Sequence, residues 1–333
     1  MKYVAGVDGG ATRTRVAIAD SRGRVLGAGE SGPSNFGSVP PGKIKEHIAD
    51  AFKKAILQAE LSDRELDSVF LGIAGVISKA DRTLILNIVD NITFLKIRKK
   101  EVDHDIRISL AGGLGMAHQE GIAFIVGTGS SCYGRTRSGH SWMSGGWGHI
   151  LDDRGSAYDL ACRGLSAVVR AEDGRGESTL LTQSMMNALD INNINQIMRH
   201  LYFEGGAGGT PMSKNEIASL APLVINAAKE EDEIAIQIID VGVKELALMV
   251  KAVRENLEFI NDQVSVVTTG GMVEQSDYIR SKLSRRINEI VPDCRMQSAK
   301  LSPVLGGVIL ALQLAGTEIN ETIKETLGSY KSV

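Results

Sequence analysis

The chain has 333 residues, of which 43% are hydrophobic and 23% charged, and its formal net charge is -3. This length suffices for two domains with separate cores, and the composition is ordinary for a folded globular protein. The slightly acidic charge gives no electrostatic basis for binding nucleic acid. No apolar run approaches the length needed to cross a bilayer. We therefore expect neither nucleic acid nor membrane as a partner.

The cysteines and the N-terminus indicate the compartment. Cys132, Cys162 and Cys294 are odd in number and widely spaced, which favours reduced thiols over a disulfide framework. The N-terminus enters a predicted strand directly, without the pattern of a signal peptide. We expect a cytoplasmic protein.

A glycine-rich turn between two apolar segments is the first functional motif. Glycine permits a positive φ, and its missing side chain lets backbone N–H groups close around an oxyanion. Asp8 stands at the end of the first strand, where a carboxylate can hold Mg²⁺ or its water. Taken alone, one Asp-Gly-Gly is better interpreted as an ordinary hairpin turn. The residues expected to contact phosphate are Asp8, Gly9, Gly10, Thr12, Arg13 and Thr14.

Apolar periodicity then predicts alternating strands and helices. A loop rich in proline and glycine, residues 31–42, contains Asn35, and the basic residues 96–100 are interpreted as a solvated helix end. Asp105 precedes a predicted helix, where Asp commonly acts as the N-cap. Strands are expected at residues 23–30, 69–75 and near 102, and helices at residues 43–60, 81–90 and 106–117.

A second copy of the strand, glycine turn and strand follows. Residues 123–126 are apolar, and a polar return runs through residues 135–139. Such a duplication predicts two related half-molecules that face one ligand. The turn residues expected to contact phosphate are Gly127, Thr128, Gly129 and Ser130.

The remaining chain continues the α/β alternation. Ser213 and Glu216 have the spacing of a capping box for a helix that begins at Ile217. A core strand in residues 264–272 ends in paired glycines. Helices are also expected at residues 159–169 and 233–257, and the last helix at residues 301–311.

In this order, the motifs resemble the BadF/BadG/BcrA/BcrD ATPase family, in its N-acetylglucosamine kinase-like branch. That branch lies in the superfamily of acetate and sugar kinases, heat-shock chaperones and actin. The resemblance covers essentially the whole chain. Besides the two glycine turns, it is carried by Gly145–Gly148, Asp153, Gly155–Tyr158, Thr269–Met272 and Ser302–Gly307.

The resemblance implies an α/β fold of two ribonuclease-H-like, actin-like ATPase domains with ATP and sugar in the cleft between them. Residues 1–117 would form the N-terminal domain, rejoined by a C-terminal helix at about 306–333. Residues 118–305 would form the second domain. A homodimer is usual among relatives.

The resemblance also implies roles for single residues. Asp105 fits the pattern of the catalytic base, and Asp103 is the alternative. Trp147 is either a cleft wall or a packing residue. Gly270, Gly271 and Met272 would lie against the adenosine, and the implied sugar contacts are Asn35, Ser131, Gly146, Trp147 and Asp153.

The implied activity is that of an ATP-dependent carbohydrate kinase with ATP and Mg²⁺ as cofactors. The expected acceptor resembles N-acetylglucosamine or glucosamine, but Ser131 replaces the Asn of animal N-acetylglucosamine kinases. A sugar acid such as 2-keto-3-deoxygluconate, or plain glucose, therefore remains an alternative. An alternative function of another class is that of the activator ATPase of a 2-hydroxyacyl-CoA dehydratase, which needs cysteine ligands for an iron–sulfur cluster.

Overall fold

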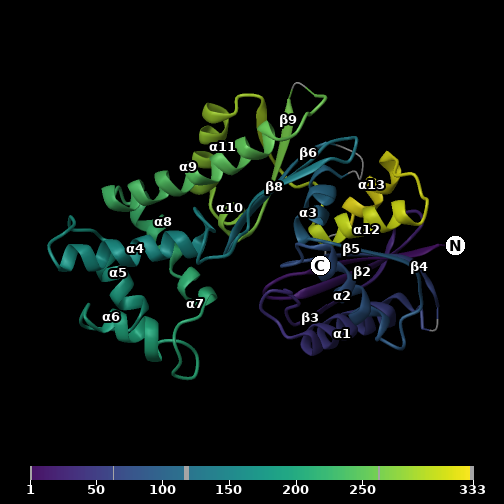
Figure 1. Cartoon of the computed structure of the whole chain (residues 1–333), viewed down its shortest axis with the longest axis horizontal. Helices are drawn as coiled ribbons and strands as arrows, with labels where there is room; N and C mark the ends of the chain where they lie inside the picture. The colour runs from purple at the N-terminus through teal and green to yellow at the C-terminus, as the bar shows by residue number, and fades with distance from the viewer. Residues whose placement is uncertain (1, 63, 116–119, 262, 331–333) are drawn as a thin grey trace. The chain divides into compact units, whose positions relative to one another are not determined.

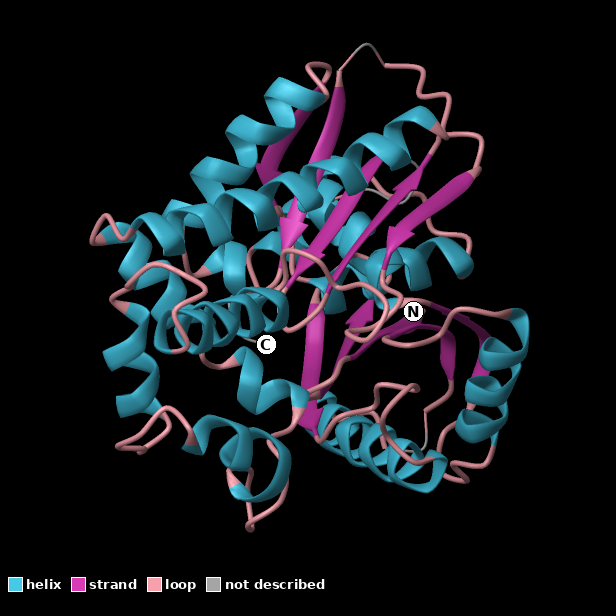
Figure 2. Ribbon diagram, turned by 60° about the vertical axis from the view of Figure 1, so that its left-hand side comes forward, coloured by secondary structure: helices cyan, strands magenta, loops and turns pink. Residues whose placement is uncertain are grey.

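The computed structural model describes residues 2–62, 64–115, 120–261 and 263–330. They form two compact units, each with a five-stranded sheet. Unit 1 comprises Met1–Ala123, Thr136–Ser138 and Gln297–Val333, and unit 2 comprises Phe124–Arg135 and Gly139–Met296. The domain boundary predicted between residues 117 and 118 lies outside the described residues. Figure 2 shows the strands of both sheets in magenta, flanked by helices in cyan.

The sheet of unit 1 has the order β3-β2-β1-β4-β5. β1, β2 and β3 form an antiparallel meander, and β4 pairs parallel with both β1 and β5. The strands are β1 (Tyr3–Gly9), β2 (Thr14–Asp20), β3 (Val25–Ser31), β4 (Leu66–Ile73) and β5 (Ile97–Asp103).

Helices cover both faces of this sheet (Figure 1). Neighbouring strand residues point to opposite faces, so Ala5 packs in the core with α1 and α2, whereas Val4 packs in the core with α3, α12 and α13. The helices are α1 (Pro41–Ala59), α2 (Lys79–Asp90), α3 (Asp105–Leu114), α12 (Pro303–Leu314) and α13 (Glu321–Gly328).

Glycines let α12 pack directly on backbone. A Cβ on Gly6 of β1 would lie 2.3 Å from the carbonyl oxygen of Val304, and one on Gly306 would lie 2.0 Å from that of Ile108. No side chain fits at such distances. The glycine pair in Ser302–Gly307 therefore allows the returning chain to join β1 and α3.

The sheet of unit 2 has the order β10-β9-β6-β7-β8, and β7 and β8 are antiparallel. The strands are β6 (Gly121–Val126), β7 (Ser130–Arg135), β8 (Ser141–Gly145), β9 (Val264–Thr269) and β10 (Cys294–Ser298). The helices are α4 (Ala157–Glu172), α5 (Leu181–Ala188), α6 (Gln196–Arg199), the π-helix η1 (His200–Glu204), α7 (Lys214–Ala218), α8 (Ala221–Lys229), α9 (Glu233–Glu255), α10 (Gly271–Glu274) and α11 (Asp277–Ile290).

Two predictions of elements are wrong. The basic residues 96–100 overlap β5, an edge strand of unit 1, rather than a helix end. Exposed lysines are common on edge strands because they oppose further pairing. The helix predicted at 301–311 is α12, but it is followed by α13 and is not the last helix. Within the described ranges, no helix is long and apolar enough to cross a membrane.

Candidate functional site

The first glycine turn, Asp8–Thr12, closes the β1–β2 hairpin and anchors the loop that follows β3. The Gly10 N–H donates to the carbonyl of Arg13 at 2.9 Å. The carbonyl of Gly10 accepts from the backbone N–H groups of Ser34 and Asn35, each at 3.1 Å. Asn35 is thereby fixed beside the turn.

The glycines of this turn serve close packing rather than an unusual backbone. Neither Gly9 nor Gly10 has a positive φ, so that part of the prediction is wrong. A Cβ on Gly9 would lie 2.4 Å from Oγ of Ser34 and 2.5 Å from Cδ1 of Ile73. Glycine is required at position 9 because these two side chains occupy the space.

The polar side chains of the turn divide into two groups. Thr12 and Arg13 are exposed at its tip. Thr14 is fully buried, and its hydroxyl donates to the carbonyl of Gly32 at 2.7 Å and lies 2.8 Å from Oγ of Ser34. We therefore assign the Thr14 hydroxyl to holding the loop, and only Thr12 and Arg13 keep the phosphate role that the sequence suggested.

Two carboxylates of unit 1 come together beside the first glycine turn. Asp8 is in the last part of β1, and Asp105 begins α3. Burial raises the pKa of Asp8 to about 6, although Arg15 and Arg13 oppose the rise. Burial and the negative charge of Asp8 raise the pKa of Asp105 to about 7. Asp105 therefore exchanges protons near neutral pH, as a general base requires.

The surroundings of Asp105 distinguish it from its alternatives. The N-cap of α3 is His104, whose ring accepts from the Arg107 N–H at 3.2 Å, so the prediction that Asp105 caps the helix is wrong. Asp103 accepts from Nη2 of Arg82 at 2.7 Å and from the His104 N–H at 2.9 Å. The Asp103 carboxylate is thus already engaged by an arginine and by the backbone, which favours Asp105 over Asp103 as the base.

The second glycine turn, Gly127–Ser131, is tied to the segment before α4. The Ser130 hydroxyl donates to the carbonyl of Arg154 at 2.9 Å. The Ser130 N–H donates to Oδ1 of Asp153 at 3.2 Å, and a Cβ on Gly129 would lie 2.9 Å from the same oxygen. Neither Gly127 nor Gly129 has a positive φ. The close approach of Asp153 is what requires glycine at position 129.

Asp153, a predicted sugar contact, is almost completely buried, at 3% exposure. Its Oδ2 accepts from Nζ of Lys214 at 2.6 Å. Its φ of 58° lies in the left-handed region, which is costly for a residue with a side chain. No sequence motif points to Lys214, because it lies at the start of a helix far along the chain.

The other predicted sugar contacts lie in both units. Ser131 on β7 pairs with Gly145 on β8, and a Cβ on Gly146 would lie 3.1 Å from Cβ of Ser131. Trp147 is 69% exposed, so it is not a core packing residue. In unit 1, Oδ1 of Asn35 accepts from the Gly37 N–H at 2.8 Å.

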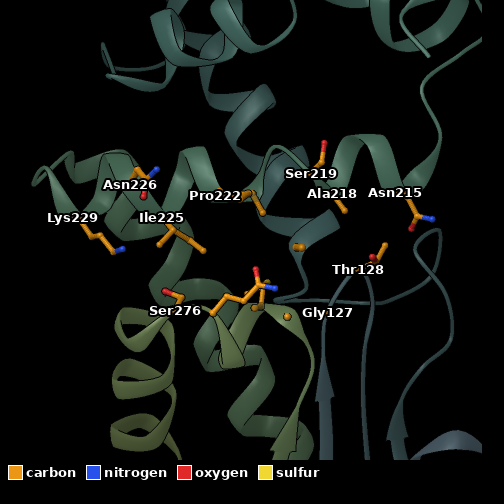
Figure 3. A pocket seen from close by; sticks show the side chains of 15 residues that line it. Gly127, Thr128, Asn215, Ala218, Ser219, Pro222, Ile225, Asn226, Lys229 and Ser276 are labelled. Carbon is orange, nitrogen blue, oxygen red and sulfur yellow. The ribbon is translucent and has the colours of Figure 1, made fainter. Parts of the chain in front are cut away.

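Unit 2 contains a pocket of about 450 Å³ beside the second glycine turn (Figure 3). This volume is typical of small-molecule sites. Thr128 and Asn215 lie toward one side, whereas Asn226 and Lys229 lie toward the other. The lining residues are Gly127, Thr128, Ala157, Asn215, Ala218, Ser219, Ala221, Pro222, Ile225, Asn226, Lys229, Gly271, Met272, Gln275 and Ser276.

The paired glycines after β9 shape the floor of this pocket. Gly270 has a φ of 105°, and a Cβ there would lie 2.5 Å from the carbonyl oxygen of Val126. Only glycine fits, and the backbone then turns so that Gly271 and Met272 line the pocket. Four residues predicted to contact the nucleotide, namely Gly127, Thr128, Gly271 and Met272, thus share one cavity.

The opposite wall was not predicted. It is formed by α7 and α8, including Asn215, Pro222, Asn226 and Lys229. Ser213 and Glu216 form the predicted capping box, although α7 begins at Lys214 and not at the predicted Ile217. The capping box does not show which face of the helix borders a ligand, and no spacing in α8 is specific for nucleotides.

The donor set fits Mg²⁺ bound with a nucleotide. Among the described residues, no three His, Cys, Asp or Glu side chains gather to hold a metal. Mg²⁺ usually binds through one or two carboxylates together with phosphates and water. Asp8 and Asp105 supply such hard oxygens beside each other, and a divalent cation would relieve their repulsion.

The cysteines do not fit an iron–sulfur cluster. Burial raises the pKa of the Cys132 thiol well above its usual value and that of Cys294 to about 12, and burial also raises that of Cys162. Cluster ligation requires thiolates. The activator alternative therefore gains no support from these side chains.

Two α/β units, each with a glycine turn between neighbouring strands, define a two-domain actin-like ATPase fold. Solved structures confirm the predicted fold class. A protein from Chromobacterium violaceum described as an N-acetylglucosamine kinase superposes with a TM-score of 0.75 at 23% identity, over 95% of this chain and 99% of that one. A ROK family glucokinase from Streptomyces griseus, solved with glucose and AMPPNP, has a TM-score of 0.58 at 16% identity, over 93% and 99% of the two chains.

The sequence profile of the BadF/BadG/BcrA/BcrD ATPase family matches residues 5–311, so the chain belongs to this family, as predicted. It is 33% identical to an N-acetylmuramic acid/N-acetylglucosamine kinase of Clostridium acetobutylicum, over 93% of this chain and 98% of that protein. It is 29% identical to an N-acetyl-D-glucosamine kinase of Dictyostelium discoideum, over 92% and 97% of the two chains.

Proposed function

We propose that the protein is an ATP-dependent carbohydrate kinase that transfers the γ-phosphoryl group of Mg-ATP to a hydroxyl of an amino sugar. The observation that carries the proposal is Asp105, a partly buried carboxylate beside Asp8 whose pKa is raised to about 7. In phosphoryl transfer the protein works mainly by positioning and by stabilising charge. A carboxylate poised near neutral pH supplies the one proton transfer that the reaction needs.

In this proposal, unit 2 binds the nucleoside and part of the phosphate chain. The pocket beside the second glycine turn has the size of a nucleoside. The apolar wall from Pro222 and Ile225 would lie against the base, and Thr128 would donate to phosphate oxygens. Gly270 and Gly271 let the backbone come close to the adenosine.

Unit 1 supplies the general base. Asp105 accepts the proton of the attacking sugar hydroxyl, so that the oxygen bonds to phosphorus while the bond to ADP breaks. Asp8 would hold Mg²⁺ or one of its waters, and the ion would neutralise charge on the β- and γ-phosphates. Thr12 and Arg13, exposed at the tip of the first turn, would donate to the phosphates.

For the acceptor, we assign the sugar contacts to the predicted set. Asn35 presents an amide whose oxygen is already held by Gly37. Ser131 on β7 lies next to Gly146, which directly follows β8. Trp147 presents an exposed ring. Asp153 would accept from a sugar hydroxyl with its remaining lone pairs.

The names of the two relatives that span nearly the full chain support an N-acetylated amino sugar over glucose or 2-keto-3-deoxygluconate. A homodimer, implied by the resemblance, and a cytoplasmic location, expected from the cysteine pattern, are retained as parts of this proposal.

The test is ADP release from Mg-ATP across N-acetylated sugars, amino sugars, plain hexoses and 2-keto-3-deoxy acids, with wild type and Asp105→Asn side by side. Acceleration by one class, lost in the variant, is expected. Slow hydrolysis that ignores every sugar would contradict the proposal.

A further inference from the structure

An ion pair joins Asp153, which lies beside the second glycine turn, to Lys214 at the start of α7. The Asp153 carboxylate is almost fully buried, whereas the Lys214 side chain is 30% exposed. Their contact of 2.6 Å neutralises the carboxylate. An isolated buried charge is unfavourable, so the ammonium group of Lys214 stabilises the Asp153 carboxylate where it lies.

The same carboxylate touches the turn itself. Its other oxygen accepts from the Ser130 N–H at 3.2 Å and lies only 2.9 Å from the position that a Cβ on Gly129 would take. The left-handed backbone of Asp153 is a further constraint. The ammonium group of Lys214 therefore helps to determine how the Asp153 carboxylate contacts the second glycine turn.

The helix that carries Lys214 also lines the nucleotide pocket. Asn215, Ala218 and Ser219 all belong to the pocket wall, and Figure 3 shows Asn215 near Thr128. The capping box fixes the start of α7, because Ser213 and Glu216 satisfy each other's backbone N–H groups. A ligand that contacts α7 is therefore linked to the backbone of Lys214 through the same short helix.

We propose that Lys214 is a positioning residue that couples occupancy of the nucleotide pocket to the Asp153 carboxylate and so to sugar binding. The inference rests on the proposed function, in which Asp153 contacts the sugar. A nucleotide in the pocket would contact α7 through Asn215, Lys214 on the same helix holds Asp153 against Ser130, and the sugar meets an already oriented acceptor. Coupling of this kind is reciprocal, so sugar tightens nucleotide binding by the same factor.

The experiment is calorimetric titration of the full chain with N-acetylglucosamine, with and without saturating Mg²⁺ and AMPPNP. In wild type, nucleotide should tighten sugar binding by about 5-fold or more, in the usual range of allosteric coupling. In Lys214→Met the ratio should fall to about one, and Lys214→Arg should keep part of it. Lys251→Met, which removes an exposed lysine paired with Glu255 on α9, should keep the full ratio.

Folding is checked by thermal melting, because Lys214→Met leaves a buried carboxylate without its partner. Lys214→Gln offers an amide donor instead and should fold while still losing the coupling. A wild-type ratio of one, or an unchanged ratio in folded Lys214 variants, would overturn the inference while leaving kinase activity in place. A wild type that binds nucleotide but neither binds nor phosphorylates any sugar would overturn the proposed function and this inference together.

Discussion

The two glycine turns have the same sequence pattern but different electrostatics. In both, a side chain from a later segment fills the space that a Cβ would need, namely Ser34 at Gly9 and Asp153 at Gly129. The first turn contains Asp8 and lies beside Asp105. Burial raises the pKa of both carboxyl groups, and the negative charge of Asp8 raises that of Asp105 further. At the second, Asp153 is neutralised by Lys214. One turn is thus suited to proton and metal chemistry, and the other to rigid binding.

The largest test of this comparison is Asp105→Asn. The amide keeps the shape of the side chain but cannot accept the proton, so kcat should fall by about 10²- to 10⁴-fold. Coupled ADP-release kinetics measure the loss, and circular dichroism checks the fold. Asp103→Asn, at a carboxylate already held by Arg82, should lower kcat less. Equal losses in the two variants would refute the assignment of the base.

The same substitution should stabilise the folded protein at alkaline pH. The folded pKa of Asp105 is raised, from 3.8 to about 7. The favourable contribution of Asp105 to the free energy of unfolding is therefore fully present below pH 3.8 and is lost as the pH rises through 7. At about 1.4 kcal/mol per pKa unit, Asp105→Asn should add on the order of 1–4 kcal/mol at pH 8 and less at pH 5. Denaturant unfolding at both pH values measures this.

Asp50 provides a control of opposite sign. A hydrogen bond from Lys54 lowers the pKa of this exposed carboxylate. The contribution of Asp50 to the free energy of unfolding is present above the pKa of the unfolded state and is lost as the pH falls through the folded pKa. Asp50→Asn should therefore weaken the fold slightly at pH 8. If Asp105→Asn instead weakened the fold at pH 8, as Asp50→Asn should, the pKa rise at Asp105 would be excluded.

A smaller effect should separate two glycines of the second turn. Gly129→Ala places a Cβ against the Asp153 carboxylate and should cost about 1–3 kcal/mol of stability through overpacking. Gly127→Ala is the matched control, because no atom lies within 4 Å of its added Cβ and its φ is not positive. Melting curves compare them. A Gly129→Ala protein as stable as wild type would show that Asp153 moves aside freely.

The smallest expected change concerns the pH profile. Since Asp105 must be deprotonated to act, kcat/KM should fall about tenfold per unit below pH 7. Asp8→Asn removes the negative charge that raises the pKa of Asp105, so the fall should move to lower pH. The pH dependence of kcat/KM is measured with the preferred sugar. Asp50→Asn, as a control, should leave this pH dependence unchanged. A profile that Asp8→Asn does not move would mean that the two carboxylates act independently.

Much of the fold was readable from local sequence because the turns, caps and periodicities are local. Both glycine turns, the capping box at Ser213 and the glycine pairs at 270–271 and 306–307 are where the sequence predicted them. The reason for the turn glycines was predicted wrongly, because a missing Cβ and a positive φ cannot be told apart without knowing what packs against the residue. The burial of Thr14 depended in the same way on the loop containing Ser34.

By itself, the sequence determined the family, the α/β alternation and the two glycine turns, since each depends on residues close together in the chain. Tertiary structure alone decided which carboxylates share an environment and which helices wall the pocket. Asp8 meets Asp105, and Asp153 meets Lys214, only after strands and helices pack. The physical reason is that burial and charge act through space, so a residue's pKa and partners depend on neighbours that its own segment does not contain.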